Sequence, residues 1–229
     1  MRRSPLGGAV ALAWLSAAGT AWAGEPPARP VALDRTEVTV AAFAAFADRA
    51  GLRTAAERDG YGHDYAGGWQ RRPGWHVRAP YGVPAAPDEP AVHVTWAEAR
   101  AYCEAAGGRL PTAEEWRAAA YTEARPAPTD GFARGRTYPY PVGDTPEGLH
   151  IAEAGARRHA PVGSGRPGVN GLHHMGGNVW EWLADRRGGE ALTAGGSWWY
   201  GAAQTRRDGL QWKEAAFHAV YIGFRCAHP

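Results

Sequence analysis

The sequence predicts an α+β domain that is rich in loops and poor in regular secondary structure. Eleven tryptophans, 31 glycines and 18 prolines occur among its 229 residues. Helical spacing of apolar residues is confined to the first half of the chain, and after Ala124 short apolar runs alternate with Gly, Pro and Asn turn signals. Large aromatic side chains, rather than long helices, are therefore expected to order this fold.

The N-terminus has the layout of a cleavable secretory signal. Two arginines precede an apolar stretch from Leu6 to Ala18, and the small-x-small sequence Ala21-Trp22-Ala23 follows it. The apolar stretch is shorter than the roughly 20 residues that span a bilayer. We therefore expect a signal peptide over residues 1–23 and a periplasmic or secreted protein with no transmembrane segment after cleavage.

Residues 24–229 are predicted to form one domain, because this length is enough to bury a substantial core. The chain carries 25 basic and 23 acidic residues, and removal of the predicted signal would make the two numbers equal. Such a balance gives no reason to expect binding to nucleic acid or to an anionic membrane. The expected partner is an exported protein or a small-molecule substrate.

The first part of this domain shows a strand pattern, a helix pattern and then an irregular segment. Asp34 to Val40 alternates in polarity like a strand, and the apolar residues that follow, up to Gly51, have helical spacing. Between Thr54 and Ala86 no period is maintained, although several aromatic residues occur. A long ordered loop, packed by its own aromatic side chains, is expected there.

Two capping boxes predict two further helices. Thr95 with Glu98 precedes a helix that stops at a pair of glycines. Thr112 with Glu115 precedes another, expected over residues 113–121.

The chain contains only two cysteines, Cys103 and Cys226. In an oxidising compartment two cysteines most simply form one disulfide, which here would close a loop of about 120 residues. A reactive or metal-binding pair is the alternative, but neither cysteine lies in a Cys-x-x-Cys or Cys/His cluster.

Four regions of the chain, in order, carry a resemblance to a known family. They are Pro90-Ala-Val-His-Val-Thr-Trp96, Ala101-Tyr-Cys-Glu-Ala-Ala-Gly-Gly-Arg-Leu-Pro-Thr-Ala-Glu-Glu-Trp116, Met175-Gly-Gly-Asn-Val-Trp-Glu-Trp182, and Gly195-Gly-Ser-Trp198 with Ile222-Gly-Phe-Arg-Cys226. Together they closely resemble the formylglycine-generating-enzyme, or sulfatase-modifying-factor, family. The resemblance implies a single domain with a C-type-lectin-like fold and a long-range disulfide, whose two positions Cys103 and Cys226 occupy.

The resemblance also identifies where catalytic residues are missing. Members of this family bind copper through two cysteines that follow the Gly-Gly-Ser motif, and these positions fall on Tyr200 and Thr205 here. Cu(I) favours thiolates, which a phenol and a hydroxyl do not supply. We therefore expect no standard sulfatase-activating chemistry from this chain.

The region after the Gly-Gly-Ser motif remains the candidate catalytic cleft, with Ser197, Trp198, Tyr200, Thr205 and Arg206 as its residues. One interpretation is an oxidase of changed mechanism, in which Tyr200 acts as a proton donor or redox group; the alternative is that Tyr200 and Trp198 are only packed aromatics. Another is a binding module, with an aromatic groove for a peptide, a glycan or a flat small molecule that would be built from Trp198, Trp199, Tyr200 and Trp212.

A further interpretation is an accessory protein for an exported metalloenzyme. The family holds calcium partly through carbonyls and a glutamate that correspond to Gly177, Val179 and Glu181, while His174 and His150 stand where oxygen ligands are usual. Imidazole weakens the expectation of calcium and would suit a transition metal such as copper, zinc or iron. Hydrogen-bonded structural histidines are the alternative.

Taken together, these patterns favour an exported accessory or oxidative-maturation factor that acts on a periplasmic protein or small molecule. A non-catalytic, lectin-like binding module is the alternative function.

Overall fold

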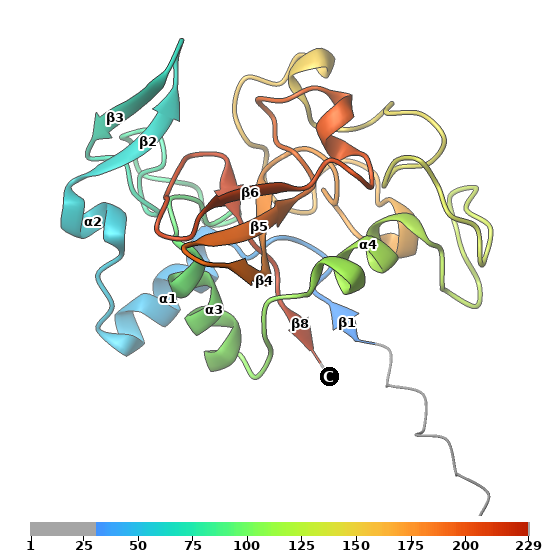
Figure 1. Cartoon of the computed structure of the whole chain (residues 1–229), viewed down its shortest axis with the longest axis horizontal. Helices are drawn as coiled ribbons and strands as arrows, with labels where there is room; N and C mark the ends of the chain where they lie inside the picture. The colour runs from blue at the N-terminus through green and yellow to red at the C-terminus, as the bar shows by residue number, and fades with distance from the viewer. Residues whose placement is uncertain (1–30, 229) are drawn as a thin grey trace, which may run out of the picture.

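The computed structural model describes residues 31–228 (Figure 1). The predicted signal peptide lies outside these residues. Short helices come first in the chain, and most strands come later. The helices are α1 (Val40–Ala50), α2 (Ala55–Asp59), α3 (Trp96–Ala105) and α4 (Ala113–Tyr121), with the 3-10 turns η1 (Ala152–Ala154), η2 (Val169–Gly171) and η3 (Ala202–Thr205).

The strands form three small sheets. They are β1 (Ala32–Leu33), β2 (Tyr61–Tyr65), β3 (Trp69–Pro73), β4 (Trp180–Arg187), β5 (Glu190–Ala194), β6 (Gln211–Glu214), β7 (Ile222–Gly223) and β8 (Ala227–His228). The largest sheet has the order β6-β5-β4-β7, in which β4 and β7 are parallel and the other pairs are antiparallel. Strands β1 and β8 pair the two ends of the described chain, and β2–β3 is a separate hairpin. The expectation of an α+β fold with little regular structure is confirmed.

The capping predictions are confirmed in detail. Thr95 and Thr112 each begin a helix with a complete capping box, and α4 covers the predicted residues 113–121. Helix α1 ends at Gly51, whose φ of 60° is the left-handed conformation that glycine adopts without strain.

The prediction of a strand from Asp34 to Val40 is wrong. In this segment only Thr39 makes a β-bridge, to Pro90. The Thr39 hydroxyl accepts a hydrogen bond from the Ala42 N–H at 3.1 Å, so this residue caps α1 and the helix already begins at Val40.

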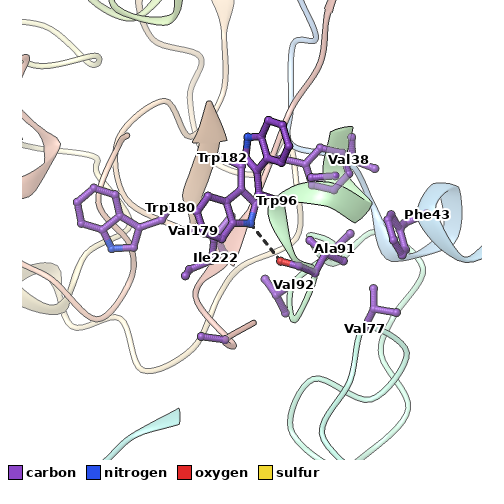
Figure 2. Packing of buried hydrophobic residues seen from close by; sticks show 14 of the residues in the cluster. Val38, Phe43, Val77, Ala91, Val92, Trp96, Val179, Trp180, Trp182 and Ile222 are labelled. Carbon is purple, nitrogen blue, oxygen red and sulfur yellow. Dashed lines mark hydrogen bonds between the residues drawn. The ribbon is translucent and has the colours of Figure 1, made fainter. Parts of the chain in front are cut away.

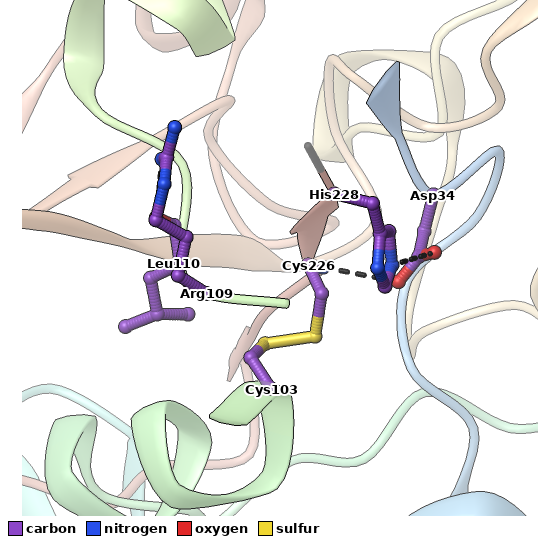
Figure 3. The surroundings of a disulfide bond; sticks show 6 residues. All are labelled: Asp34, Cys103, Arg109, Leu110, Cys226 and His228. Carbon is purple, nitrogen blue, oxygen red and sulfur yellow. Dashed lines mark hydrogen bonds and ion pairs between the residues drawn. A yellow bond between two sulfur atoms is a disulfide. The ribbon is translucent and has the colours of Figure 1, made fainter. Parts of the chain in front are cut away.

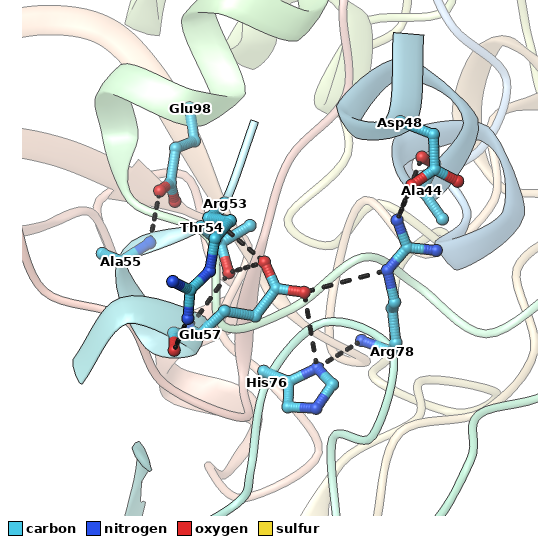
Figure 4. Close-up of polar contacts among 9 residues, drawn as sticks. All are labelled: Ala44, Asp48, Arg53, Thr54, Ala55, Glu57, His76, Arg78 and Glu98. Atoms are coloured by element: carbon cyan, nitrogen blue, oxygen red, sulfur yellow. Dashed lines mark hydrogen bonds and ion pairs between the residues drawn. The ribbon is translucent and has the colours of Figure 1, made fainter. Parts of the chain in front are cut away.

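The irregular segment between Thr54 and Ala86 also contains more structure than expected. Thr54 and Glu57 form a third capping box, which begins α2, and the β2–β3 hairpin follows. Figure 4 shows that Glu57 also faces His76 and Arg78 from the loop beyond the hairpin, at 4.0 and 3.8 Å. The Thr-x-x-Glu pattern that identified the other two helices was present here too.

The main core surrounds the start of β4. Trp180 and Trp182 are fully buried there, with Val179 before them and Ile222 on the neighbouring strand (Figure 2). The Trp182 indole N–H donates to the Val94 carbonyl at 3.1 Å, which satisfies a polar group that burial would otherwise leave without a partner. Aromatic side chains thus organise the interior, as the composition predicted.

The disulfide between Cys103 and Cys226 is confirmed (Figure 3). It joins α3 to the C-terminal segment across 123 residues of sequence, with a Cα–Cα distance of 5.5 Å. Asp34 accepts a hydrogen bond from the Cys226 N–H at 3.1 Å and contacts His228 at 2.9 Å, so the N-terminal segment is attached at the same place. In the described residues no helix is long and apolar enough to cross a membrane.

We expect replacement of both cysteines by alanine to lower the free energy of unfolding by about 4 to 5 kcal/mol, because the unfolded chain would regain the entropy of a long loop. Urea unfolding of the oxidised protein and of the Cys103→Ala/Cys226→Ala variant measures this difference. Equal midpoints would show that the crosslink does not stabilise the fold.

Candidate functional site: an aromatic cleft

A cavity of about 660 Å³ opens between the β2–β3 hairpin and β6. We call it the aromatic cleft. Its aromatic wall consists of Tyr61, His63, Trp69, Tyr200, Trp212 and Phe217. Its polar wall consists of Asp59, Arg71, Gln211, Lys213, Glu214 and His218.

Exposed aromatic rings continue from this cleft over the surface. Trp69, Trp199 and Tyr65 are 50%, 42% and 38% exposed, and Val83 is the only other large apolar side chain exposed to this degree in residues 31–228. The ring of Tyr65 lies 5.4 Å from that of Trp69 and 6.3 Å from that of Trp199, between centroids. We call these three residues the aromatic patch. Contiguous exposed apolar surface of this kind marks binding sites.

The β2–β3 hairpin positions Trp69. Residues 65 and 69 face each other at the end of the ladder, and the turn between them uses two glycines with positive φ. The hairpin stands at the edge of the molecule in Figure 1. The Trp69 ring packs edge-on against Phe217 at 4.6 Å between centroids. Trp69 thus has one side supported while half of its surface stays accessible.

Tyr200 is the one predicted cleft residue that lines the cavity. Its ring lies 5.3 Å from Trp180 and 6.3 Å from Tyr221, between centroids. Burial raises the pKa of Tyr200 above its ordinary value, so the phenol is protonated at neutral pH. The side chain offers a hydroxyl and an aromatic surface to a ligand, and it is a poor general base.

The other four predicted residues occupy different places. Ser197 and Trp198 are buried beneath the surface. Thr205 is also buried, and its hydroxyl donates to the Ala202 carbonyl at 2.8 Å. Arg206 is exposed, with its guanidinium 5.4 Å from the ring centroid of Tyr140. The structure therefore does not place the five residues around one cavity.

Lys213 is one of several cleft residues that the sequence did not predict, together with His63, Trp69 and Phe217. It is the only lysine of the chain. Its Nζ lies 4.5 Å from the ring centroid of Trp180 and donates to Gln211 Oε1 at 3.0 Å. Burial lowers the pKa of Lys213 to about 8. The signal that could have found it is a lone lysine beside Trp212 in a short strand.

The predicted calcium ligand Glu181 is already occupied by protein donors. Its carboxylate accepts hydrogen bonds from Arg225 Nε at 2.8 Å and Nη2 at 2.7 Å, and from the Trp116 indole N–H at 2.7 Å. Glu181, Arg225 and Trp116 are all fully buried. Arg225 also donates to the carbonyls of Asp34 and His173, at 3.0 and 2.7 Å.

A second buried carboxyl lies in this network. Glu37 accepts a hydrogen bond from Asn178 at 2.8 Å through Oε1, while its Oε2 has no partner among the described residues. Burial raises the pKa of Glu37, and also that of Glu181, where Arg225 opposes the rise.

The other predicted metal residues do not complete a site. The rings of His150 and His174 lie 6.4 Å apart, and their Nε2 atoms contact the Arg158 carbonyl at 2.8 Å and the Ser164 hydroxyl at 3.2 Å. Burial lowers the pKa of His174 to about 4.

Gly177 pairs its backbone with His150, and Val179 is buried in the core. Residues 31–228 contain no group of three His, Cys, Asp or Glu side chains arranged to hold a metal. A calcium site needs several free oxygen donors, and the carboxylate of Glu181 is committed to its ion pair, so these residues do not fit calcium. Tyr200 and Thr205 likewise do not fit Cu(I).

Comparison with known proteins defines the class. The model of the sulfatase-modifying factor enzyme 1-like domain matches residues 18–229, so the chain belongs to the formylglycine-generating-enzyme family. The formylglycine-generating enzyme of Streptomyces coelicolor is 36% identical over 191 residues, covering 69% of this chain and 58% of that protein. The chain spans about half to two thirds of the length of the curated formylglycine-generating enzymes it matches.

The family has members of different activity. The inactive Cα-formylglycine-generating enzyme 2 of Mus musculus is 32% identical over 253 residues, covering 89% of this chain and 78% of that protein. A hercynine oxygenase of Mycolicibacterium thermoresistibile is 33% identical over 175 residues, which cover 66% of this chain and 35% of that protein.

Solved structures confirm the fold. CarF gives a TM-score of 0.61 at 22% identity, and PvdO from Pseudomonas aeruginosa gives a TM-score of 0.61 at 20% identity. The match to CarF covers 87% of this chain and 86% of the CarF chain. The match to PvdO covers 86% of this chain and 79% of the PvdO chain. The fold is thus the C-type-lectin-like fold of this family, as the motifs implied.

We expect Arg225→Met to lower the free energy of unfolding by about 3 to 5 kcal/mol, because Glu181 would remain buried without its counter-charge. The exposed pair Arg136–Asp144 offers a control, since both side chains are more than half exposed. Arg136→Met should cost about 1 kcal/mol or less. Urea unfolding of both variants tests this; similar losses would show that the buried pair is not central.

Proposed function

We propose that this chain is an exported accessory protein that binds an aromatic group of its target in the aromatic cleft, without the copper-dependent oxidation of cysteine. The observation that carries this proposal is the aromatic patch, which continues into the cleft at Tyr200, where the family's first copper-binding cysteine would stand. Export is supported by the signal-like sequence of residues 1–23. The target is an exported protein or a small molecule.

Energetics support a binding role for the patch. Indole and phenol rings supply large contact areas at low cost in side-chain entropy, and aromatic pairs are worth about 0.5 to 1.5 kcal/mol beyond the area they bury. Trp69 is half exposed, whereas five tryptophans of the fold are buried, namely Trp96, Trp116, Trp180, Trp182 and Trp198. A ring that enters the cleft would cover this exposed surface and stack against a side chain already supported by Phe217.

The chemistry of the cleft favours binding over acid–base catalysis. Tyr200 has a raised pKa, and burial lowers the pKa of His63, the other titratable ring on the aromatic wall whose pKa is shifted. Both groups are therefore neutral at pH 7. An oxidative-maturation role would need a redox group. Tyr200 and Thr205 lack the thiolates that would hold Cu(I) at this place.

We expect the disulfide-intact protein to take up no stoichiometric Cu(I), because the two cysteine positions carry oxygen donors. Anaerobic loading with Cu(I), removal of excess and elemental analysis should give the same low copper content for the wild type and for Tyr200→Phe/Thr205→Val. His174→Ala serves as a second comparison. If the wild type bound one equivalent of copper and either variant lost it, this result would contradict the proposal.

We expect N-acetyl-L-tyrosinamide to shift the indole N–H signals of the cleft in NMR titrations, and N-acetyl-L-leucinamide to shift them far less. Trp69→Ala should weaken binding of the aromatic probe about fivefold or more, from loss of roughly 1 kcal/mol of stacking. Val83→Ala is the matched control, since Val83 is 56% exposed outside the cleft. If Trp69→Ala and Val83→Ala weakened binding equally, the aromatic cleft would be excluded as the binding site.

A further inference from the structure

Lys213 is a cation without a counter-charge in the wall of the aromatic cleft. Within residues 31–228 its polar contact is the neutral Gln211 Oε1, and its Nζ rests on the face of Trp180. It takes part in none of the ion pairs of the described residues, and burial is the cause of its lowered pKa. Partly burying an ammonium without a carboxylate costs free energy that this side chain recovers only in part from the indole face.

The other charged groups of the cleft are engaged elsewhere or face solvent. Asp59 contacts His218 Nε2 at 3.3 Å, and the Arg71 guanidinium lies 4.7 Å from the Tyr61 ring centroid. His63 Nδ1 contacts the His218 carbonyl at 3.0 Å, and Glu214 is exposed. None of these groups neutralises Lys213, so an anion that enters the cleft would be its first counter-charge.

We propose that the aromatic cleft takes a ligand that carries an aromatic ring and a carboxylate, with Lys213 as the residue that recognises the carboxylate. This inference rests on the proposed function and specifies its ligand class. The ring would pack on Trp69 and Phe217, and the carboxylate would accept a charge-assisted hydrogen bond from the ammonium of Lys213, a residue that lines the same cavity. The chemistry covers a free aromatic acid and a C-terminal aromatic residue alike.

The ammonium supplies both affinity and discrimination. A hydrogen bond to a charged group contributes about 1.5 to 3 kcal/mol, which corresponds to roughly tenfold or more in affinity. A neutral amide in place of the carboxylate gains no ion pair with this cation. The cleft should therefore prefer an acid over its amide even when the aromatic parts are identical.

Protonation of Lys213 sets the pH dependence of this preference. Below its free pKa of about 8 the amine is charged, and binding of a carboxylate raises that pKa further. Affinity for the acid is thus full well below pH 8, falls as pH rises from about 8 to the higher pKa of the complex, and is constant above it. The charged and titratable neighbours named above, Asp59, His63, Arg71, Glu214 and His218, are the same in acid and amide complexes, so the amide is the control.

The test compares N-acetyl-L-tyrosine with N-acetyl-L-tyrosinamide, which differ only in the carboxylate. NMR titration at pH 7 should show about tenfold or more tighter binding of the acid. Lys213→Gln should abolish this preference, so that acid and amide bind with similar affinity. Lys213→Arg should keep the preference and hold it above pH 9, because a guanidinium stays charged there.

The single lysine permits a direct measurement of its pKa. Reductive methylation with ¹³C-formaldehyde labels Lys213 and the terminal amine, and Lys213→Gln assigns the two signals. The Lys213 signal should titrate near pH 8 in the free protein and at a higher pH with the acid bound.

Equal binding of acid and amide, both sensitive to Trp69→Ala, would overturn the role of Lys213 and leave the proposed function intact. A preference for the acid that survives Lys213→Gln would also overturn it. Failure of both probes to bind would overturn this inference together with the proposed binding of an aromatic group.

Discussion

The buried ion pair between Glu181 and Arg225 is the interaction on which the rest of the structure depends. Glu181 lies in β4 at the centre of the largest sheet, and Arg225 lies between β7 and the disulfide-bonded Cys226. Glu181 also accepts a hydrogen bond from Trp116 of α4, and Arg225 donates one to the Asp34 carbonyl of the N-terminal segment. Two desolvated charges persist in the core because nearly every donor and acceptor around them is used.

This network explains why the family resemblance is strong although Tyr200 and Thr205 stand at the copper-binding cysteine positions. Glu181, Trp116 and Arg225 come from three of the motifs that identify the family, and here all three hold the scaffold together. The aromatic cleft is built mainly from the β2–β3 hairpin and the segment 211–218, which lie outside those motifs. Scaffold and binding surface can therefore change independently, since function resides in the site rather than in the fold.

The sequence predicted what is local or covalent. Capping boxes at Thr95 and Thr112 depend on contacts three residues apart, and the two cysteines left one pairing. The strand expected before Val40 failed because the segment makes only isolated backbone hydrogen bonds, such as those from Asp34 to Cys226 and from Val38 to Phe224, before Thr39 caps α1. Tyr200 and Trp212, predicted as residues of an aromatic groove, do line the cleft. The rest of the cleft could not be predicted, because Trp69 and Lys213 are 144 positions apart in sequence and meet only through the hairpin and β6. Alternation along a strand does not show which face borders a cavity.

Comparison of the two cations, Arg225 and Lys213, separates structure from function. Arg225 is fully buried and meets a carboxylate through two nitrogens, so its charge is compensated within the fold. Lys213 is partly buried and meets an amide oxygen and an indole face. A residue whose role were only to pack would lose little by becoming neutral, as glutamine or methionine would fill similar space. Lys213 lines the aromatic cleft, and an anionic ligand in this cleft would remove the electrostatic cost of its uncompensated ammonium.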